Sequence, residues 1–205
     1  MNEMLTALGA GVAALLPITN PVGAVAAFAA LTDGDSPANL RRQAWRTGMW
    51  VAGILLVFAA LGSVLLNALG ITLPALQIGG GLVVAYSGFG MITPRQGLTD
   101  AESTHAAAKP DVSFSPMALP LVAGPGAIGV VIALCARNPG LASRAGVMVA
   151  VVLVAVLVAA VLRWGTPVVD RLGPTGIGAL VRVMGFLILV IGVELVIHGV
   201  QALTA

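Results

Sequence analysis

Charge is the scarcest property of this chain. Only 9% of its 205 residues are Asp, Glu, Lys or Arg, whereas 59% are hydrophobic, and the mean hydropathy is +1.04. Soluble domains carry about 25% charged residues, so this composition indicates a protein that crosses the lipid bilayer several times. The formal net charge of +2 is too small for an extended basic surface, and we expect no nucleic-acid partner.

Cysteine and the motifs of catalysis are nearly absent as well. The single cysteine, Cys135, excludes an internal disulfide, and no zinc-type cluster surrounds it. The chain has no H-E-x-x-H, no paired-aspartate motif and no Walker motif. We therefore expect a protein that is not an enzyme, consumes no ATP, and has no cofactor and no metal site. The apolar N-terminal run lacks a basic segment before it, which favours a retained membrane helix over a cleaved signal peptide.

Uncharged stretches predict six membrane spans. A helix needs about 20 apolar residues to cross the hydrocarbon core, so the stretch between Arg46 and Arg95 must hold two helices. The predicted spans cover about 4–31, 47–68, 74–93, 113–135, 144–164 and 179–202. Most Arg and Lys residues fall after the first, third and fifth spans, and only Arg137 and Arg144 fall on the other side. The positive-inside rule then places both termini outside the cytoplasm.

Proline and glycine interrupt the first and fourth spans. Residues 17–23 read Pro-Ile-Thr-Asn-Pro-Val-Gly, and residues 120–126 read Pro-Leu-Val-Ala-Gly-Pro-Gly. Proline removes a backbone donor and clashes with the preceding turn, so both helices should be broken at mid-membrane. Lipid cannot satisfy the freed backbone groups, and such paired breaks are typical of a transporter site between two repeats.

The two halves of the chain match each other. Residues 1–93 and 113–205 each begin with a broken helix, continue through an unbroken one and end with a glycine-bearing third helix, and a polar linker, 94–112, joins them on the predicted cytoplasmic side. Three spans per half is an odd number, so the halves must insert upside down relative to each other. The predicted fold is one all-α membrane domain of six transmembrane helices, arranged as two inverted three-helix repeats.

The breaks suggest a site for a small zwitterion. Asn20 is a preferred N-cap and Pro21 suits the first helical position, so a half-helix should begin there, and another should begin after Gly124. Such N-termini bind carboxylate or phosphate, while carbonyls near 15–17 and 118–120, freed by the prolines, suit an ammonium group. The candidate substrate-binding residues are Thr19, Asn20, Pro21, Val22, Gly23, Ala123, Gly124, Pro125, Gly126 and Ala127.

Few other residues stand out along the spans. Glu194 lies within the last one, where a charged carboxyl costs about 2.5–3.5 kcal/mol, and it is the candidate for proton coupling. The alternative is a structural carboxyl bonded to His198. The glycines of this span are more typical of helix packing than of ligand binding. The fifth span is almost featureless Ala, Val and Leu, which favours a lipid-facing scaffold. Further polar candidates at or near membrane depth are Asn67, Gln77 and Ser87, and Thr19 is favoured over them because it lies in a break.

The chain resembles the MarC family of bacterial inner-membrane proteins. The resemblance rests on Asn20-Pro21-Val22-Gly23, on 119–128 with its Leu-Pro-Leu-Val-Ala-Gly-Pro-Gly core, and on the Gly-Gly start of the third span, and it extends over nearly the whole chain. It implies a multi-pass protein of the inner membrane, here with periplasmic termini, that transports small neutral amino acids, in an arrangement similar to LysE-type exporters. Family members commonly have Asn and Pro where this chain has Ala24 and Ala26, which implies a less kinked first half-helix and a less polar site.

Three functions remain open at this point. The leading one is a secondary transporter for small neutral amino acids or similar small zwitterions, with the lipid bilayer and a small-molecule substrate as its partners. A passive small-solute channel would use the same half-helices around an open path. A non-transporting membrane scaffold would leave the twin breaks without a role. The sequence leaves the oligomeric state open, a homo-oligomer included.

Overall fold

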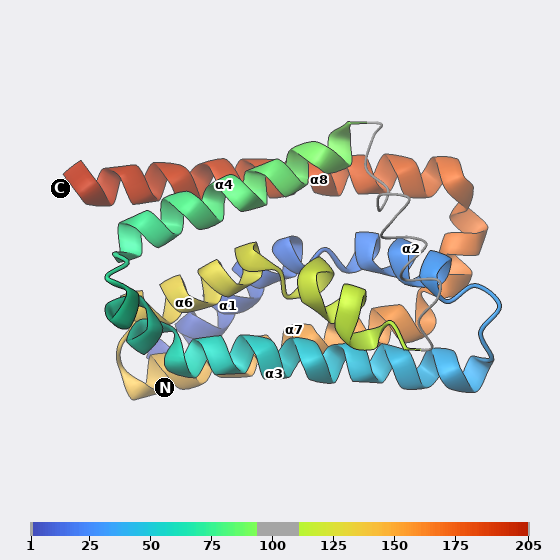
Figure 1. Cartoon of the computed structure of the whole chain (residues 1–205), viewed down its shortest axis with the longest axis horizontal. Coiled ribbons are helices and arrows are strands. Elements are labelled where there is room, and N and C mark those ends of the chain that lie inside the picture. The colour runs from blue at the N-terminus through green and yellow to red at the C-terminus, as the bar shows by residue number, and fades with distance from the viewer. Residues whose placement is uncertain (1, 94–110, 205) are drawn as a thin grey trace.

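The computed structural model describes residues 2–93 and 111–204, and all regular structure in these ranges is helical (Figure 1). The elements are α1 (Asn2–Thr19), α2 (Pro21–Leu31), α3 (Pro37–Leu69), α4 (Leu73–Ile92), η1 (Ser113–Val122), α6 (Pro125–Arg137), α7 (Leu141–Trp164) and α8 (Thr166–Thr204). Five segments are long and apolar enough to cross a membrane, with α1 and α2 together forming one of them, and the bent pair of η1 and α6 makes a sixth. The predicted all-α membrane fold is confirmed.

Local sequence explains where the helices begin and end. Ser36 and Thr72 cap α3 and α4 by accepting hydrogen bonds from backbone N–H groups three residues on, and a proline follows each cap. Gly70 ends α3 in the left-handed conformation that glycine adopts without strain. The helix α3 begins ten residues before the predicted span, because its first turns, which carry three arginines, extend beyond the apolar stretch. The last helix also begins earlier than predicted and is kinked at Gly173, where φ is 64°.

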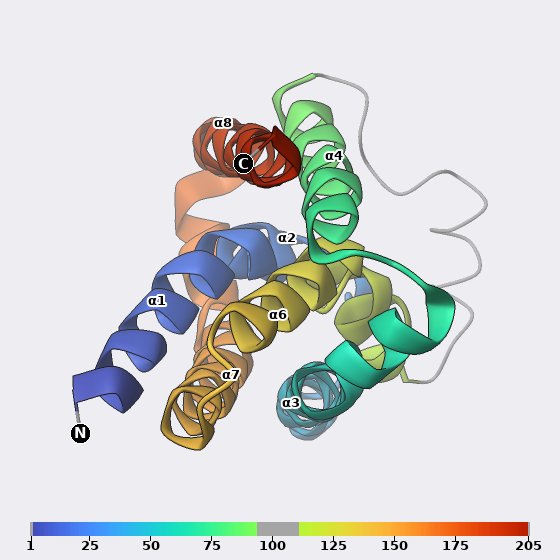
Figure 2. The same cartoon turned by 90° about the vertical axis from the view of Figure 1, so that its left-hand side faces the viewer.

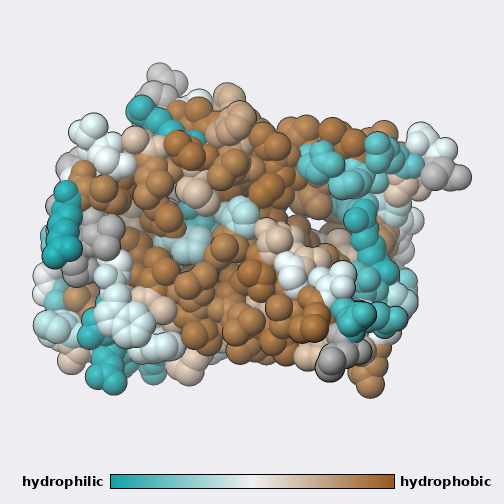
Figure 3. Space-filling model, turned by 180° about the vertical axis from the view of Figure 1, so that it is seen from behind, coloured by the Kyte–Doolittle hydropathy of each residue, from teal (hydrophilic) through white to brown (hydrophobic). Residues whose placement is uncertain are grey.

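Both ends of the molecule are polar and its middle is apolar. Figure 3 shows a broad hydrophobic zone across the molecule, with hydrophilic residues gathered towards either end. The two termini lie at the same end, as an even number of spans requires (Figure 1). The arginine-bearing start of α3 lies at the opposite end, as the predicted orientation requires, although which end faces the cytoplasm remains a prediction.

Helices α4 and α8 pack along most of their lengths and form a layer beside the remaining helices (Figure 2). Glycines allow this close approach: a Cβ atom at Gly81 would lie 2.6 Å from the Gly192 carbonyl oxygen, and one at Gly88 would lie 2.6 Å from the Gly185 oxygen. Small residues at such contacts let two membrane helices bring their backbones together. The interpretation of these glycines as packing residues is confirmed.

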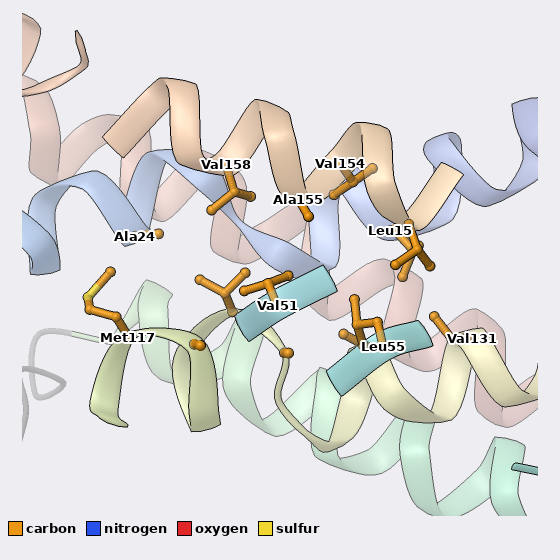
Figure 4. Close-up of a cluster of buried hydrophobic side chains, with 14 of the residues drawn as sticks. Leu15, Ala24, Val51, Leu55, Met117, Val131, Val154, Ala155 and Val158 are labelled. Atoms are coloured by element: carbon orange, nitrogen blue, oxygen red, sulfur yellow. The ribbon is translucent and has the colours of Figure 1, made fainter. Parts of the chain in front are cut away.

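The second layer surrounds α7, and here the expectation of a lipid-facing fifth span holds for only one face of the helix. Half of its most apolar window is buried, against 17–33% for the other four of the five segments that are each long enough to span. Figure 4 shows Val154, Ala155 and Val158 of α7 facing Leu15 and Val51 from neighbouring helices. One face of α7 packs on α1 and α3, whereas Val152, Leu153 and Val156 on its other face are 42–49% exposed. In a membrane protein the core and the lipid-facing surface are equally apolar, so composition could not distinguish them.

Helix pairings in the two halves correspond. The helix α2 packs on α8, and its counterpart in the second half, α6, packs on α4. In the same way α1 packs on α7, and its counterpart η1 packs on α3. The counterparts α3 and α7 pack on each other, as do the counterparts α4 and α8. Figure 1 shows α1 and the η1–α6 segment running in opposite directions along the molecule. Such an exchange of pairs is what an inverted repeat requires. The repeat itself, and the division at 1–93 and 113–205, remain predictions.

Candidate functional site

The first break occurs at a single residue, Asn20. Its backbone is in the left-handed region (φ 43°, ψ 64°), and its side-chain oxygen accepts a hydrogen bond from the Gly23 N–H at 3.1 Å. Its carbonyl accepts from the Ala24 N–H at 2.9 Å, and its own N–H donates to the Pro17 carbonyl at 3.0 Å. The predicted capping role of Asn20 is confirmed. Because these bonds are internal, the Gly23 and Ala24 amides are not free to bind a ligand.

The second break is larger, and its two parts meet at an angle of 61°. The segment η1 has prolines at 116 and 120 and hydrogen bonds that skip five residues, from the Met117 N–H to the Val112 carbonyl and from the Ala123 N–H to the Ala118 carbonyl. Ser115 and Leu119 have extended backbones within it, so this half-helix is less regular than predicted. Two prolines four residues apart remove the donors that an α-helix needs there.

New backbone donors appear where α6 begins. Gly124 is the N-cap residue, with an extended backbone and no side-chain cap, and Pro125 carries no N–H. Among the described residues, neither the Gly126 N–H nor the Ala127 N–H donates to a protein acceptor, and the first amide of this helix with a partner is that of Ile128, which donates to the Gly124 carbonyl at 3.1 Å. Two free donors at the positive end of a helix dipole suit an anionic group.

A cavity of about 80 Å³ lies at this break. Its walls come from Ile18 just before the first break, from α4, from the second break and from Ile188 of α8. The lining residues are Ile18, Val83, Val84, Ser87, Pro120, Leu121, Val122, Gly124, Pro125, Gly126, Ala127 and Ile188. A space of this size holds a few water molecules or one small solute. It brings both halves of the chain together next to the free amides.

Only part of the predicted site lines this cavity. Gly124, Pro125, Gly126 and Ala127 line it, whereas Ala123 is fully buried beside it. Of the first break, Val22 instead lines a separate apolar cavity of about 400 Å³ between α2, α7 and α8. Asn20 turns its amide nitrogen towards the sulfur of Met91, at 3.4 Å.

Thr19 and Pro21, also predicted for the site, are buried. The Thr19 hydroxyl donates to the Leu16 carbonyl at 3.1 Å and so serves its own helix. Ser87 lines the cavity instead, and it replaces Thr19 as the polar side chain of the site. The sequence marked Ser87 as a candidate because it is a polar residue within an apolar span. The sequence could not show that the rotation of α4 turns this side chain towards the second break.

The expected free carbonyls are partly accounted for within the chain. The carbonyls of Leu16 and Pro17 accept from Thr19 and Asn20, and that of Ala118 accepts from the Ala123 N–H at 2.8 Å. The expectation that these oxygens lack partners was therefore wrong for Leu16, Pro17 and Ala118. Turns just after each proline supply new donors, so the chain satisfies most of its own acceptors before a ligand arrives.

The space beside each glycine is already occupied. A Cβ atom at Gly23 would lie 2.2 Å from the Asn20 amide nitrogen, one at Gly124 would lie 2.5 Å from the Pro120 oxygen, and one at Gly126 would lie 2.3 Å from the Val84 side chain. These glycines permit the turns and the packing of the breaks. Substituting them would change the structure of the site as well as access to it.

Glu194 is not part of this site. Its side chain is 60% exposed on α8, and its carboxylate lies 3.6 Å from Nε2 of His198. The glycines on the opposite side of α8, Gly192 and Gly199, pack on α4. The sequence left open which face of this helix turns inward, and the structure shows that it is the glycine face.

Buried polar contacts at both ends of the bundle were missed. Gln43 is 2% exposed, donates to the Asp35 carboxylate at 2.6 Å and accepts from the Val112 N–H at 2.8 Å, so it ties the loop before α3 to the start of η1. At the other end Gln77, with its amide oxygen facing Arg137, accepts two hydrogen bonds from that guanidinium. Among the described residues, no group of three or more His, Cys, Asp or Glu is placed to hold a metal ion.

The fold and the site together define a class: a polytopic helical membrane protein with two interrupted spans and a small, partly open pocket at the second interruption. The profile described as "MarC family integral membrane protein" matches residues 5–204. The chain belongs to the MarC family.

Relatives in two genera are similar over almost their whole lengths. The inner membrane protein MarC of Salmonella typhimurium (strain LT2) is 35% identical, with 98% of this chain and 96% of the relative covered. The inner membrane protein MarC of Escherichia coli (strain SMS-3-5) is 34% identical with the same coverage. No solved structure matches this chain. The predicted resemblance is confirmed.

Proposed function

We propose that this protein is a secondary transporter of small neutral amino acids or similar small zwitterions, which bind at the second break. The observation that carries this proposal is the pair of unpartnered amides at the buried residues Gly126 and Ala127, which line a partly open pocket of about 80 Å³ between apolar helices. Backbone groups at membrane depth are normally paired, because lipid offers them no partner. Free donors beside a small cavity therefore support a ligand with an anionic group.

The size and lining of the cavity limit the substrate. Its walls are mainly Val, Ile, Pro, Gly and Ala, with Ser87 as the one polar side chain among its lining residues. Among the described residues neither Arg nor Lys lines it, so a carboxylate would be held there by the helix N-terminus alone, at about 1–2 kcal/mol. Glycine, alanine and serine are the amino acids of suitable size.

Thermal stabilisation of the purified protein by alanine and its analogues tests the zwitterion. Ethylamine lacks the carboxylate of alanine and propionate lacks its amine, while both keep its size. We expect stabilisation by alanine, and roughly 5- to 30-fold weaker binding of ethylamine, which is the fold-change for 1–2 kcal/mol. Equal binding of alanine, ethylamine and propionate would show that the breaks do not form a zwitterion site.

Ser87→Leu tests the location, because the larger side chain would fill the cavity. Tyr86→Leu is the matched control, since Tyr86 is the neighbouring residue of α4 and is 72% exposed. Only the Ser87 variant should lose binding. Counterflow of preloaded alanine in proteoliposomes then separates a carrier from a channel, since an open pore gives no counterflow.

We also propose the bacterial inner membrane with periplasmic termini as the location, from the arginines at the end opposite the termini. A C-terminal reporter active only in the periplasm should give signal, and signal from a cytoplasm-specific reporter contradicts this orientation.

Glu194 is the candidate for proton coupling. If it has this role, Glu194→Gln should flatten the pH profile of uptake, and an unchanged profile assigns it another role.

A further inference from the structure

The exposed face of α8 carries a polar pair inside an apolar surface. Glu194 and His198 are 60% and 44% exposed at their side chains and lie one helical turn apart. Around them the surface is made of large apolar side chains that are 43–58% exposed: Phe186, Leu187, Val190, Val193 and Ile197. The span to which they belong is also the least buried of the candidate spans, at 17%.

The packing of α8 on α4 fixes the depth of this pair. A Cβ atom at Gly199 would contact Pro74 at the start of α4, and one at Gly192 would contact Ala85 near its middle. Glu194 is therefore level with about Gly81, roughly 12 Å inside the first turn of α4. The helix α4 has 20 residues, about the thickness of the hydrocarbon core. The carboxyl therefore lies about one helical turn further into the apolar zone than the Gln77–Arg137 contact at that end of the bundle.

Lipid is a poor environment for this pair. An acidic group at membrane depth is rare and normally faces protein or a water-filled cavity. Here the opposite side of α8 faces α4 through its glycines, and among the described residues the one basic side chain within 4 Å of the Glu194 carboxylate is His198. The remaining hydrogen-bonding positions of the carboxylate and the imidazole need partners from outside the chain.

We propose that this face of α8 is the interface of a homodimer. A carboxylate and an imidazole on one surface make it self-complementary, because a two-fold axis along the membrane normal brings both pairs to the same depth in the two copies. The carboxylate of each copy can then accept from the imidazole of the other, and the surrounding apolar side chains exclude lipid from the pair. A different protein would have to present a carboxylate and an imidazole at the same depth, whereas a second copy of this chain already carries both groups there.

Cysteine cross-linking in the native membrane tests the interface. In a Cys135→Ala background, Ile197→Cys places a thiol on the proposed face, and Val57→Cys, 54% exposed on α3, is the matched control on another outer surface. An oxidant should cross-link the Ile197 variant to twice the chain mass of 20.5 kDa and leave the Val57 variant monomeric. Absence of this product, equal cross-linking of both variants, or a product containing another protein would overturn the proposal.

The role of the polar pair is tested by mass measurement in mild detergent. Wild type should elute as a dimer, and Glu194→Leu should weaken dimerisation about tenfold, equivalent to about 1.4 kcal/mol. The leucine also removes a carboxyl from the lipid face, so the monomer should fold at least as well, with an unchanged thermal midpoint or a higher one. A monomeric wild type, or a Glu194→Leu dimer as tight as wild type, would refute the assignment.

Discussion

The contact between α4 and α8 offers a sharp test of the packing argument, because two glycines in one turn of α4 have opposite surroundings. A Cβ atom at Gly81 would lie 2.6 Å from the Gly192 carbonyl oxygen and 2.9 Å from the backbone nitrogen of Val196. A Cβ atom at Gly79 would have no neighbour within 4 Å. Both positions lie in the same helix at nearly the same depth. Alanine at each therefore isolates the effect of packing from that of helix propensity.

The expected magnitudes follow from these distances. Alanine is favoured over glycine in a helix by about 0.5–1 kcal/mol, so Gly79→Ala should be neutral or stabilising. At Gly81 the same gain is opposed by overpacking of about 1–3 kcal/mol, since the nearest atoms belong to the backbone of α8 and cannot rotate away. The gain in helix propensity cancels between the two variants, so we expect them to differ in stability by the overpacking alone, about 1–3 kcal/mol.

Thermal unfolding in one detergent at one scan rate measures this difference. One kcal/mol shifts the midpoint of a chain of this size by about 2–4 °C, so Gly81→Ala should unfold roughly 2–12 °C below Gly79→Ala. Using a single scan rate matters, because membrane proteins often unfold irreversibly. A Gly81 variant as stable as the Gly79 variant would show that α4 and α8 do not pack as closely as described.

Three further predictions concern the breaks and the end of the bundle opposite the termini. Asn20→Ala should destabilise by about 2–3 kcal/mol, from the lost cap and the left-handed backbone, and Asn20→Gly by less, because glycine accepts that backbone; equal midpoints would contradict this. Gln43→Leu leaves the buried Val112 N–H unpaired and should lower stability by about 1–3 kcal/mol, whereas Gln201→Leu on an exposed position should have no effect, as thermal midpoints would show. Desolvation raises the pKa of Asp111, but hydrogen bonds from Ser113 and the pairing with Arg46 outweigh it and hold the pKa below its usual range. The ionised carboxylate therefore stabilises the fold above its ordinary pKa of 3.8, and this contribution, at most about 1 kcal/mol for so exposed a pair, is lost as the pH falls through the lowered value. Midpoints measured from pH 6 to pH 3 should fall less for Asp111→Asn than for wild type, and parallel curves would refute this.

The sequence alone determined the fold class, the number of spans and the positions of both breaks. These follow from local physics: the length of uncharged runs sets the spans, and proline removes backbone donors wherever it occurs. The capping role of Asn20 and the packing role of the α8 glycines were also predictable, since each depends on residue type and spacing within one helix. The family followed from the same local motifs.

Tertiary structure decided which residues share a site. Ser87, Val84 and Ile188 reach the second break only because of how α4 and α8 rotate as a pair. At the first break the Gly23 and Ala24 amides donate to Asn20 instead. The burial of α7 could not be predicted, because core and lipid-facing residues have the same apolar character in a membrane. For the same reason only the packing of α8 could show that Glu194 faces outward. Periodicity shows that a helix has two faces, but which face turns inward depends on contacts between helices far apart in the sequence.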